Sequence, residues 1–168
     1  MERTVTLKDK PLTVIGPELQ VGEKAPDFEL IDQKLAPVAL SDTSGRPRIF
    51  SVVPSLDTPV CDAQTKRFNE AAAKFSGVDF YTISMDLPFG QKRWCNSFGV
   101  ENIKMLSDHR SGSFGTAYGT LIEDQRIESR AIFVIDKDDV IQYVEYVKEL
   151  ASAANYDRAI EEVEKITG

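Results

Sequence analysis

The sequence has few of the side chains on which most metal and redox sites depend. Its 168 residues include two cysteines, Cys61 and Cys95, and a single histidine, His109. Two cysteines are too few for a disulfide-stapled scaffold, and these two do not form a C-x-x-C pair. One histidine excludes most zinc sites and any catalytic triad that needs a second histidine. If the protein is an enzyme, these absences favour sulfur as its nucleophile or redox centre.

Positive charge is also scarce, and long hydrophobic runs are missing. Lysine and arginine total 20 against 27 for aspartate and glutamate, which leaves a net charge of −7 at pH 7. An acidic chain repels phosphate backbones, so we expect no nucleic-acid partner. No apolar run approaches the roughly 18 residues that a membrane span requires, and the charged N-terminus lacks an apolar signal region. The sequence therefore predicts a cytoplasmic protein with no membrane partner.

Short strand and helix patterns alternate along the chain, and 42% hydrophobic residues suffice for the core of one domain over residues 1–168. Residues 4–7 and 12–15 flank a polar turn and predict an N-terminal β-hairpin. Further elements follow from apolar periodicity. Strands are expected at 28–31, 48–53, 78–84, 103–106, 130–135 and 140–147, and helices at 61–75, 89–98, 112–118 and after Asn155. This order predicts an α/β, thioredoxin-like fold: a central mixed β-sheet flanked by helices, with the hairpin added to it.

The most informative stretch is PSLDTPVC, residues 54–61. It lies between a predicted buried strand and a predicted helix, and Cys61 falls in the first turn of that helix. Unpaired backbone N–H groups and the positive end of the helix dipole favour a thiolate there. The alternative is a small buried cysteine on a helix face. The hydroxyl of Thr58 upstream and Pro54 at the strand end argue against that alternative.

This stretch resembles the P-x-x-x-T-x-x-C signature of the peroxiredoxins, and the likeness continues along the chain. DLPFGQKRWC (86–95), SRAIFVID (129–136) and GEKAPDFEL (22–30) are similar to the thiol peroxidase branch of that family, an atypical two-cysteine type. The resemblance covers nearly the whole chain. It implies a thiol-dependent peroxidase that reduces hydrogen peroxide and organic hydroperoxides without a cofactor.

The resemblance also implies roles for five residues. Cys61 resembles the peroxidatic cysteine, which attacks the peroxide, and Cys95 resembles the resolving cysteine of the same chain. Thr58 is similar to the threonine that orients thiolate and peroxide, and Pro54 to the proline that shields the pocket from water. Arg130 resembles the arginine that contacts the thiolate and a peroxide oxygen. The implied cycle runs through a sulfenic acid on Cys61 and a Cys61–Cys95 disulfide, which thioredoxin reduces, in a family branch that is usually homodimeric.

Each of these residues also has a purely structural explanation. Thr58 can cap the helix, Pro54 can close a strand, and Arg130 can be a surface charge. Cys95 can be an inert core thiol or half of a permanent disulfide with Cys61, although a reducing cytoplasm argues against permanence.

Two rival functions stay open on the residues alone. One is a thioredoxin-type disulfide reductase or isomerase, against which the missing C-x-x-C motif argues. The other is a non-enzymatic redox-sensing, binding or chaperone module on the same scaffold, because a fold does not by itself establish a function.

The positions of the two cysteines predict a movement. Cys61 begins one predicted helix and Cys95 lies in another, whereas a disulfide requires Cα atoms about 4.4–6.8 Å apart. A pocket that shields Cys61 is not expected to hold Cys95 so close. We expect the segment 89–98 to rearrange, because Gly90 and Gly99 make it weakly helical.

Overall fold

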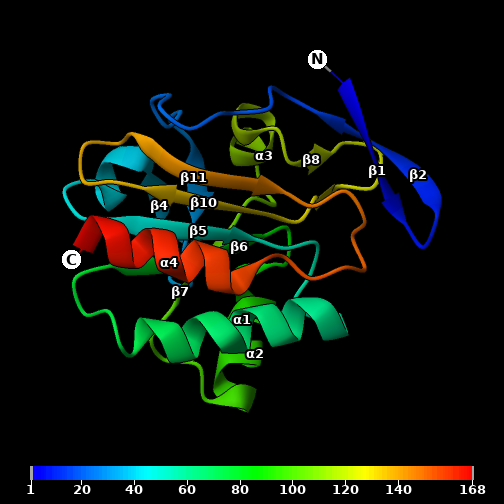
Figure 1. The fold of residues 1–168 in the computed structure, drawn as a ribbon. Coiled ribbons are helices and arrows are strands. Elements are labelled where there is room, and N and C mark those ends of the chain that lie inside the picture. The colour runs from blue at the N-terminus through cyan, green and yellow to red at the C-terminus, as the bar shows by residue number, and fades with distance from the viewer. Residues whose placement is uncertain (1, 168) are drawn as a thin grey trace.

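The computed structural model describes residues 2–167, apart from the side chains of Pro59, Cys61 and Asp62. Its centre is a seven-stranded sheet with the strand order β11-β10-β5-β6-β7-β3-β4 (Figure 1). Strands β5, β6 and β7 run parallel and the other neighbouring pairs run antiparallel, so the sheet is mixed. The strands are Glu29–Ile31 (β3), Pro37–Ala39 (β4), Arg48–Val52 (β5), Asp79–Ser84 (β6), Lys104–Ser107 (β7), Ala131–Ile135 (β10) and Ile141–Tyr146 (β11).

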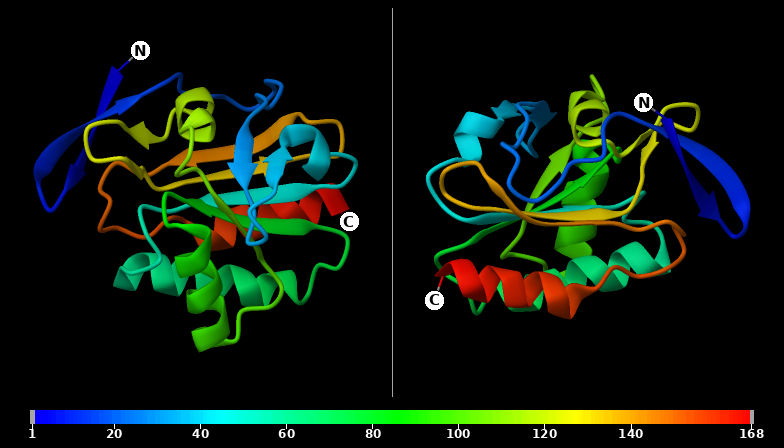
Figure 2. Two further views of the ribbon diagram at one scale, coloured as in Figure 1. Left: turned by 180° about the vertical axis from the view of Figure 1, so that it is seen from behind. Right: turned by 45° about the horizontal axis from the view of Figure 1, so that its top comes forward.

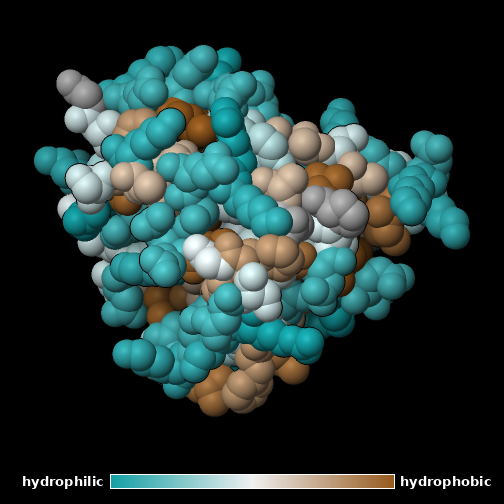
Figure 3. Space-filling model, turned by 90° about the horizontal axis from the view of Figure 1, so that it is seen from below, coloured by the Kyte–Doolittle hydropathy of each residue, from teal (hydrophilic) through white to brown (hydrophobic). Residues whose placement is uncertain are grey.

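Helices cover both faces of this sheet, as the two views of Figure 2 show. One face carries α1 (Pro59–Ala72), α2 (Pro88–Phe98) and α4 (Tyr156–Thr167). The other carries α3 (Ser113–Tyr118) and the 3-10 helix η1 (Leu40–Thr43). Viewed from the side of α1, α2 and α4, the surface is mostly hydrophilic, with hydrophobic residues gathered in a few places (Figure 3). Within the described residues, no helix is long and apolar enough to cross a membrane.

The central strands are apolar on both sides because each side meets a helical layer. In β10, Ile132 and Val134 pack toward α1 and α4, whereas the alternating Phe133 and Ile135 pack toward α3. Burying one such side chain contributes about 1.5–3 kcal/mol. These two cores hold the sheet rigid, and the ends of its strands then fix the residues that follow them.

A second, four-stranded sheet has the order β1-β2-β8-β9. It joins the N-terminal hairpin to a later part of the chain, with Ile15 of β2 opposite Leu121 of β8. Lys8 and Asp9 form the hairpin turn, and their φ values of 49° and 68° are those of a type I′ turn. The strands are Glu2–Leu7 (β1), Lys10–Ile15 (β2), Leu121–Ile122 (β8) and Ile127–Glu128 (β9).

The structure confirms the predicted hairpin, long strands and helices, and it corrects one helix. The helix predicted at 61–75 begins at Pro59 and ends at Ala72. Beyond Ala72 the α-helix gives way to a tighter turn, in which the N–H of Lys74 donates to the carbonyl of Ala71 at 2.9 Å. Gly77 therefore does not terminate it. The cap of α4 is as predicted, because Asn155 Oδ1 accepts the N–H of Arg158 at 3.0 Å.

Candidate active site

A cavity of about 390 Å³ lies beside the start of α1. Pro54, Thr58 and Arg130 all line it, so the structure brings together three of the five predicted site residues. The rest of its wall is largely apolar and comes from four separate segments of the chain: Leu7, Lys8, Ser55, Val60, Ile127, Leu150 and Ala151. An apolar cavity with a few convergent polar groups is the usual form of a small-molecule site.

Cys61 is the third residue of α1, in the helix's first turn, as the sequence predicts. Its side chain lies outside the described part of the structure. Thr58 directly precedes α1 and Val60 is its second residue, and both line the cavity, so the backbone that carries Cys61 borders it. The first N–H groups of a helix have no partner within the helix and carry its positive dipole end. That environment favours a thiolate over a thiol.

Arg130 directly precedes β10, and only 1% of it is exposed. Its Nε and Nη2 donate to the carbonyl oxygen of Leu150 at 3.3 and 2.7 Å, and its Nη1 donates to Oε1 of Gln64 at 3.1 Å. Among the described side chains, no carboxylate forms an ion pair with it. Arg130 is therefore a buried cation held by neutral dipoles, and the alternative that it is a surface charge is wrong.

Gln64 holds Arg130 in place, and the sequence reasoning missed it. Gln64 is fully buried on α1, and its Nε2 donates to Oγ of Ser51 at 2.6 Å. This bond orients the amide so that its oxygen faces Arg130. Ser51 interrupts the apolar residues of β5, and Gln64 lies on the buried face of α1. A polar residue in such a position was the one available signal, because buried polar groups need partners.

Asp86 anchors the loop between β5 and α1 and was also missed as a supporting residue. Its Oδ1 accepts the hydroxyl of Ser55 at 2.8 Å, and its Oδ2 accepts the N–H of Leu56 at 2.9 Å and the hydroxyl of Ser84 at 2.8 Å. The hydroxyl of Thr58 donates to the carbonyl of Ser55 at 3.2 Å. The loop that leads into Cys61 is thus fixed by the residues that lead into α2.

Cys95 lines a different cavity, of about 470 Å³, which none of Pro54, Thr58 and Arg130 lines. It is a free, half-buried thiol on α2, and its Sγ accepts a hydrogen bond from Nε2 of Gln33 at 3.8 Å. Burial raises the pKa of the Cys95 thiol, and the bond from Gln33 opposes this rise. A raised pKa keeps the thiol protonated and slow to react with peroxides. Among the described side chains, the structure therefore does not place Cys95 in the cavity that Pro54, Thr58 and Arg130 line.

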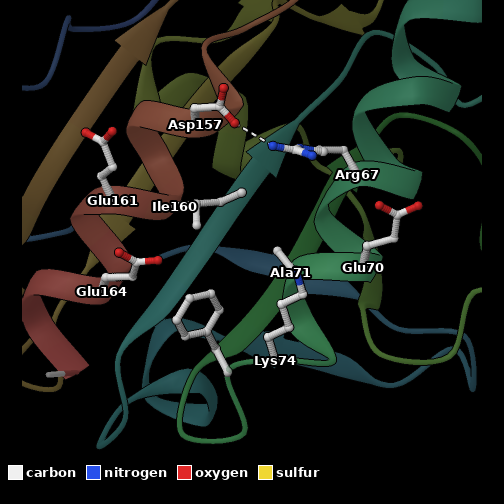
Figure 4. Close-up of a pocket in the computed structure, with 9 residues that line it drawn as sticks. Arg67, Glu70, Ala71, Lys74, Asp157, Ile160, Glu161 and Glu164 are labelled. Atoms are coloured by element: carbon white, nitrogen blue, oxygen red, sulfur yellow. Dashed lines mark hydrogen bonds and ion pairs between the residues drawn. The ribbon is translucent and has the colours of Figure 1, made fainter.

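A larger groove, of about 500 Å³, separates α1 from α4 (Figure 4). Arg67 of α1 forms an ion pair with Asp157 of α4 across it. Its other charged side chains include Glu70 and Glu164, but the described residues contain no group of three that could hold a metal ion. The groove is an exposed contact between two helices, and its described lining residues include no cysteine, serine or threonine.

Known proteins with similar sequences share nearly the whole length of this chain. The model of the AhpC/TSA family matches residues 21–144. A thiol peroxidase of Halalkalibacterium halodurans is 52% identical over 158 residues, which cover 94% of this chain and 95% of that protein. A thiol peroxidase of Bacillus subtilis is 48% identical, with 94% of each chain covered.

Solved structures with a similar fold also superpose on nearly the whole chain. A peroxiredoxin-like protein from Aquifex aeolicus superposes with a TM-score of 0.90 at 41% identity, over 98% of this chain and 97% of its own. A thiol peroxidase from Chromobacterium violaceum superposes over the full length of both chains with a TM-score of 0.89, and at 24% identity it speaks for the fold alone. The predicted thioredoxin-like α/β fold is confirmed.

Proposed function

This chain belongs to the AhpC/TSA family and is a thiol-dependent peroxidase, and we propose that it works through Cys61. The observation that supports this assignment is the cavity at the start of α1. It gathers Pro54, Thr58 and a buried Arg130 around the turn that carries Cys61. Neither a disulfide reductase nor a non-enzymatic module is favoured by the family.

In the proposed reaction, the Cys61 thiolate attacks one oxygen of the peroxide. An S–O bond forms as the O–O bond breaks, so sulfur is oxidised to a sulfenic acid and the departing oxygen is reduced. That oxygen leaves as hydroxide or alkoxide and takes up a proton to give water or an alcohol. Negative charge therefore passes from sulfur to the departing oxygen, and donors around the cavity stabilise it as it moves.

Lowering the pKa of the thiol does not suffice for such a reaction. A free thiol with a pKa of about 8.5 is about 3% ionised at pH 7, and a pKa of about 6 would raise this to about 90%. The gain is about 30-fold, and it is reduced because nucleophilicity falls with the pKa. Most of the rate acceleration must come from groups that bind the transition state more strongly than the peroxide.

Arg130 is the strongest donor available for that purpose. Its guanidinium has five N–H bonds, and three of them point to Leu150 and Gln64. Two N–H bonds remain, one on each terminal nitrogen, for a sulfur and an oxygen in the cavity. The planar fork presents them side by side and keeps its charge at any physiological pH.

We further propose that Cys95 resolves the sulfenic acid. Its thiol displaces the sulfenic hydroxyl as water and forms a Cys61–Cys95 disulfide, which thioredoxin reduces by thiol–disulfide exchange. Because Cys95 lines a cavity other than the one that Pro54, Thr58 and Arg130 line, we expect this step to involve a movement of α1 or α2. A homodimeric, cytoplasmic protein completes the proposal, and its dimeric state rests on the resemblance to the thiol peroxidase branch.

Two cysteine variants test this function. We expect Cys61→Ser to abolish peroxide turnover coupled to thioredoxin, because a hydroxyl is not a usable nucleophile at neutral pH. Cys95→Ser should still undergo the first oxidation, and mass spectrometry should find a sulfenic acid on Cys61. Thioredoxin-coupled turnover that survives in Cys61→Ser would refute the assignment. Unchanged steady-state turnover in Cys95→Ser would remove Cys95 from the cycle.

A further inference from the structure

The sulfur of Cys95 is bound by a residue from a distant part of the chain. Nε2 of Gln33 donates a hydrogen bond to Sγ of Cys95 at 3.8 Å, across 62 positions of the sequence. Both side chains are half-buried, and both line the cavity of about 470 Å³. In the proposed cycle Cys95 leaves this cavity to reach Cys61. The bond to Gln33 therefore breaks in every turnover.

Gln33 projects from a tightly closed turn between β3 and β4. Oδ1 of Asp32 accepts the N–H groups of Lys34 and Ala36 at 2.8 and 3.0 Å. The N–H of Asp32 donates to the carbonyl of Ala36 at 3.0 Å, and the φ of Leu35 is 65°. Asp side chains that accept N–H groups of their own turn fix its backbone. The backbone at Gln33 is therefore held in place, near one edge of the central sheet.

This turn lies away from Cys61 both across the sheet and along its strands. In the strand order, β6 and β7 separate β5, which leads to Cys61, from β3, which leads to Gln33. Neighbouring strands lie about 4.8 Å apart, so β5 and β3 are about 14 Å apart. Cys61 follows the C-terminal end of β5, whereas β3 runs antiparallel to β7 and leads toward the N-terminal ends of the parallel strands. The bond from Gln33 thus draws Cys95 away from Cys61.

Two other contacts hold α2 on either side of Cys95. One turn before it, the buried Gln91 donates to the carbonyl of Leu106 at 2.9 Å and fixes the N-terminal half of the helix to the sheet. Beyond it, the ring centroid of Phe98 lies 4.1 Å from Nζ of Lys66, which belongs to α1. Neither of these contacts opposes a shift of the C-terminal half toward α1. The bond from the turn between β3 and β4 does oppose it.

We propose that Gln33 is a positioning residue for the resolving step: its amide holds the reduced Cys95 thiol in its own cavity and slows its delivery to Cys61. The bond exists in the conformation that keeps the cysteines apart and is lost in the one that joins them. A contact made in only one of two conformations shifts the equilibrium toward that conformation. This inference rests on the proposed function of Cys61 and Cys95.

The chemistry of the step does not involve Gln33. The S–S bond forms as the S–O bond of the sulfenic acid breaks, and the hydroxyl leaves as water with the thiol proton. Cys95 attacks only after it has left Gln33, so the reactivity of the delivered thiol is the same with or without that side chain. Gln33 also does not line the cavity at the start of α1. Its loss should therefore leave the oxidation of Cys61 unchanged.

Gln33→Met and Gln33→Glu test the role of the bond, because both remove the N–H donor and keep a side chain of similar length. Reduced protein is mixed with hydrogen peroxide, and quenched-flow mass spectrometry follows the thiol, sulfenic acid and disulfide forms. The rate of Cys61 oxidation is proportional to the peroxide concentration, whereas the rate of disulfide formation is independent of it. We expect both variants to form the disulfide about two- to fivefold faster, since sulfur is a weak acceptor.

Lys34→Met is the matched control. Lys34 follows Gln33 in the same turn and lines the same cavity, but within the described residues no hydrogen bond joins its side chain to Cys95. This variant should form the disulfide at the rate of the unmodified protein.

The pH profile of Cys95 alkylation in the reduced protein gives a second readout. The bond from Gln33 lowers the pKa of the Cys95 thiol, against the rise that burial causes. We expect the midpoint of alkylation by iodoacetamide to lie at a higher pH in Gln33→Met. A general loosening of the turn would instead expose the thiol and move the midpoint to a lower pH. The charged residues that line the cavity are the same in both proteins: Asp32, Lys34, Asp42, Glu101 and Lys104.

Disulfide formation that is unchanged or slower in Gln33→Met would overturn the inference. So would an equal acceleration in Lys34→Met, or a midpoint of alkylation that falls. All three are read while peroxide still oxidises Cys61 and the disulfide still forms, so the proposed function would stand. If the unmodified protein forms no disulfide between Cys61 and Cys95, the proposed resolving step fails and the inference fails with it.

Discussion

Arg130 is held by the carbonyl of Leu150 and the amide oxygen of Gln64, and no acid among the described side chains neutralises it. A carboxylate partner would compete with the thiolate and the developing oxyanion for the same charge. Neutral dipoles position the guanidinium and leave its charge to act on the cavity.

Replacing Arg130 by lysine should be nearly as damaging as replacing it by alanine. A lysine provides one point charge and cannot reach Leu150 and Gln64 while also presenting two parallel donors. We expect the rate of Cys61 oxidation by hydrogen peroxide to fall by about 10²–10³ in both variants. Stopped-flow measurement checks this, with the exposed Arg93→Lys as a control. A rate in Arg130→Lys close to that of the unmodified protein would contradict it.

Glu128 is a second unusual residue, and it lies outside the active site. It is fully buried, and the hydroxyl of Thr120 donates to its Oε2 at 2.6 Å. Burial raises the pKa of Glu128 well above its ordinary range, and the neighbouring Asp108 raises it further. The folded protein therefore keeps a proton on Glu128 at pH values where the unfolded chain has lost it.

This difference in bound protons between the folded and unfolded states determines whether stability rises or falls with pH. Where the folded state binds more protons than the unfolded state, the free energy of unfolding falls as the pH rises. We expect Glu128→Gln, which has nearly the same shape and no charge, to melt at a higher temperature than the unmodified protein at pH 8. The gap should narrow toward pH 5. Melting curves that differ by a constant amount across this range, or the same trend in the exposed Glu123→Gln, would contradict the prediction.

Among the elements, α2 combines firm anchors with an exposed apolar surface. Gln91 is buried and donates to the carbonyl of Leu106 at 2.9 Å, while Phe89 and Phe98 are 69% and 50% exposed. The helix ends at Phe98 and is capped by Gly99, whose φ is 63°. A helix that buries few of its large apolar side chains gains little from packing, so its opening requires less free energy.

Oxidation should therefore change the fluorescence of Trp94, which lies next to Cys95 and is the only tryptophan. Trp94 is 7% exposed, and the centroid of its ring is 5.0 Å from that of the Phe98 ring. We expect one equivalent of peroxide to change the emission of the reduced protein, and thioredoxin or dithiothreitol to restore it. Most of the change should be missing in Cys95→Ser. Identical emission of the reduced and disulfide forms would show that α2 does not rearrange.

Elements differ in how well the sequence alone predicts them. The helices and the longer strands repeat their apolar residues often enough for a period to be recognised. Strands β8 and β9 have two residues each and pair with each other across a short turn, Ile122 opposite Ile127. Two residues are too few for a period to be recognised, and the pairing of Leu121 with the distant Ile15 is made by the fold. The placement of the hairpin was missed with them.

The residues of the candidate site likewise divide into those that a sequence pattern predicts and those that only the fold brings together. A motif within eight residues predicted Pro54, Thr58 and Cys61, and the resemblance added Arg130 and Cys95. The supporting bonds of Gln64 to Arg130 and of Asp86 to Ser55 span 66 and 31 positions along the chain. Such pairs are made by the fold, so they could not be recognised before it was known.

At the scale of the whole molecule, a small third core joins the four-stranded sheet to the segment that follows β11. Val5 and Val14 of the hairpin pack there with Ile122 and Leu150, and all four are buried. Leu150 also belongs to the segment that holds Arg130. The stability of the hairpin and the geometry of the active site therefore depend on the same contacts.

Shortening one side chain in this core should lower both the stability of the protein and the rate at which peroxide oxidises it. We expect Val14→Ala to lower the free energy of unfolding by about 1–3 kcal/mol, because it leaves a void at a fully buried position. Oxidation by peroxide should slow as Leu150 loses its support. Urea unfolding and stopped-flow rates measure the two effects, with the exposed Thr13→Ala as the control. Loss of stability with an unchanged rate would separate the hairpin from the site.

Cys95 lines a cavity apart from the one that Pro54, Thr58 and Arg130 line, and this separation implies a delay in the proposed catalytic cycle. On the proposed mechanism, a newly formed sulfenic acid must wait until a helix moves and delivers Cys95. During that wait a second peroxide molecule competes for the same sulfur and would convert it to a sulfinic acid, which is a dead end without a dedicated repair enzyme. The fraction of enzyme lost per turnover then rises in proportion to the peroxide concentration. Such an enzyme is suited to removing peroxide at low concentrations and is inactivated by peroxide at high concentrations.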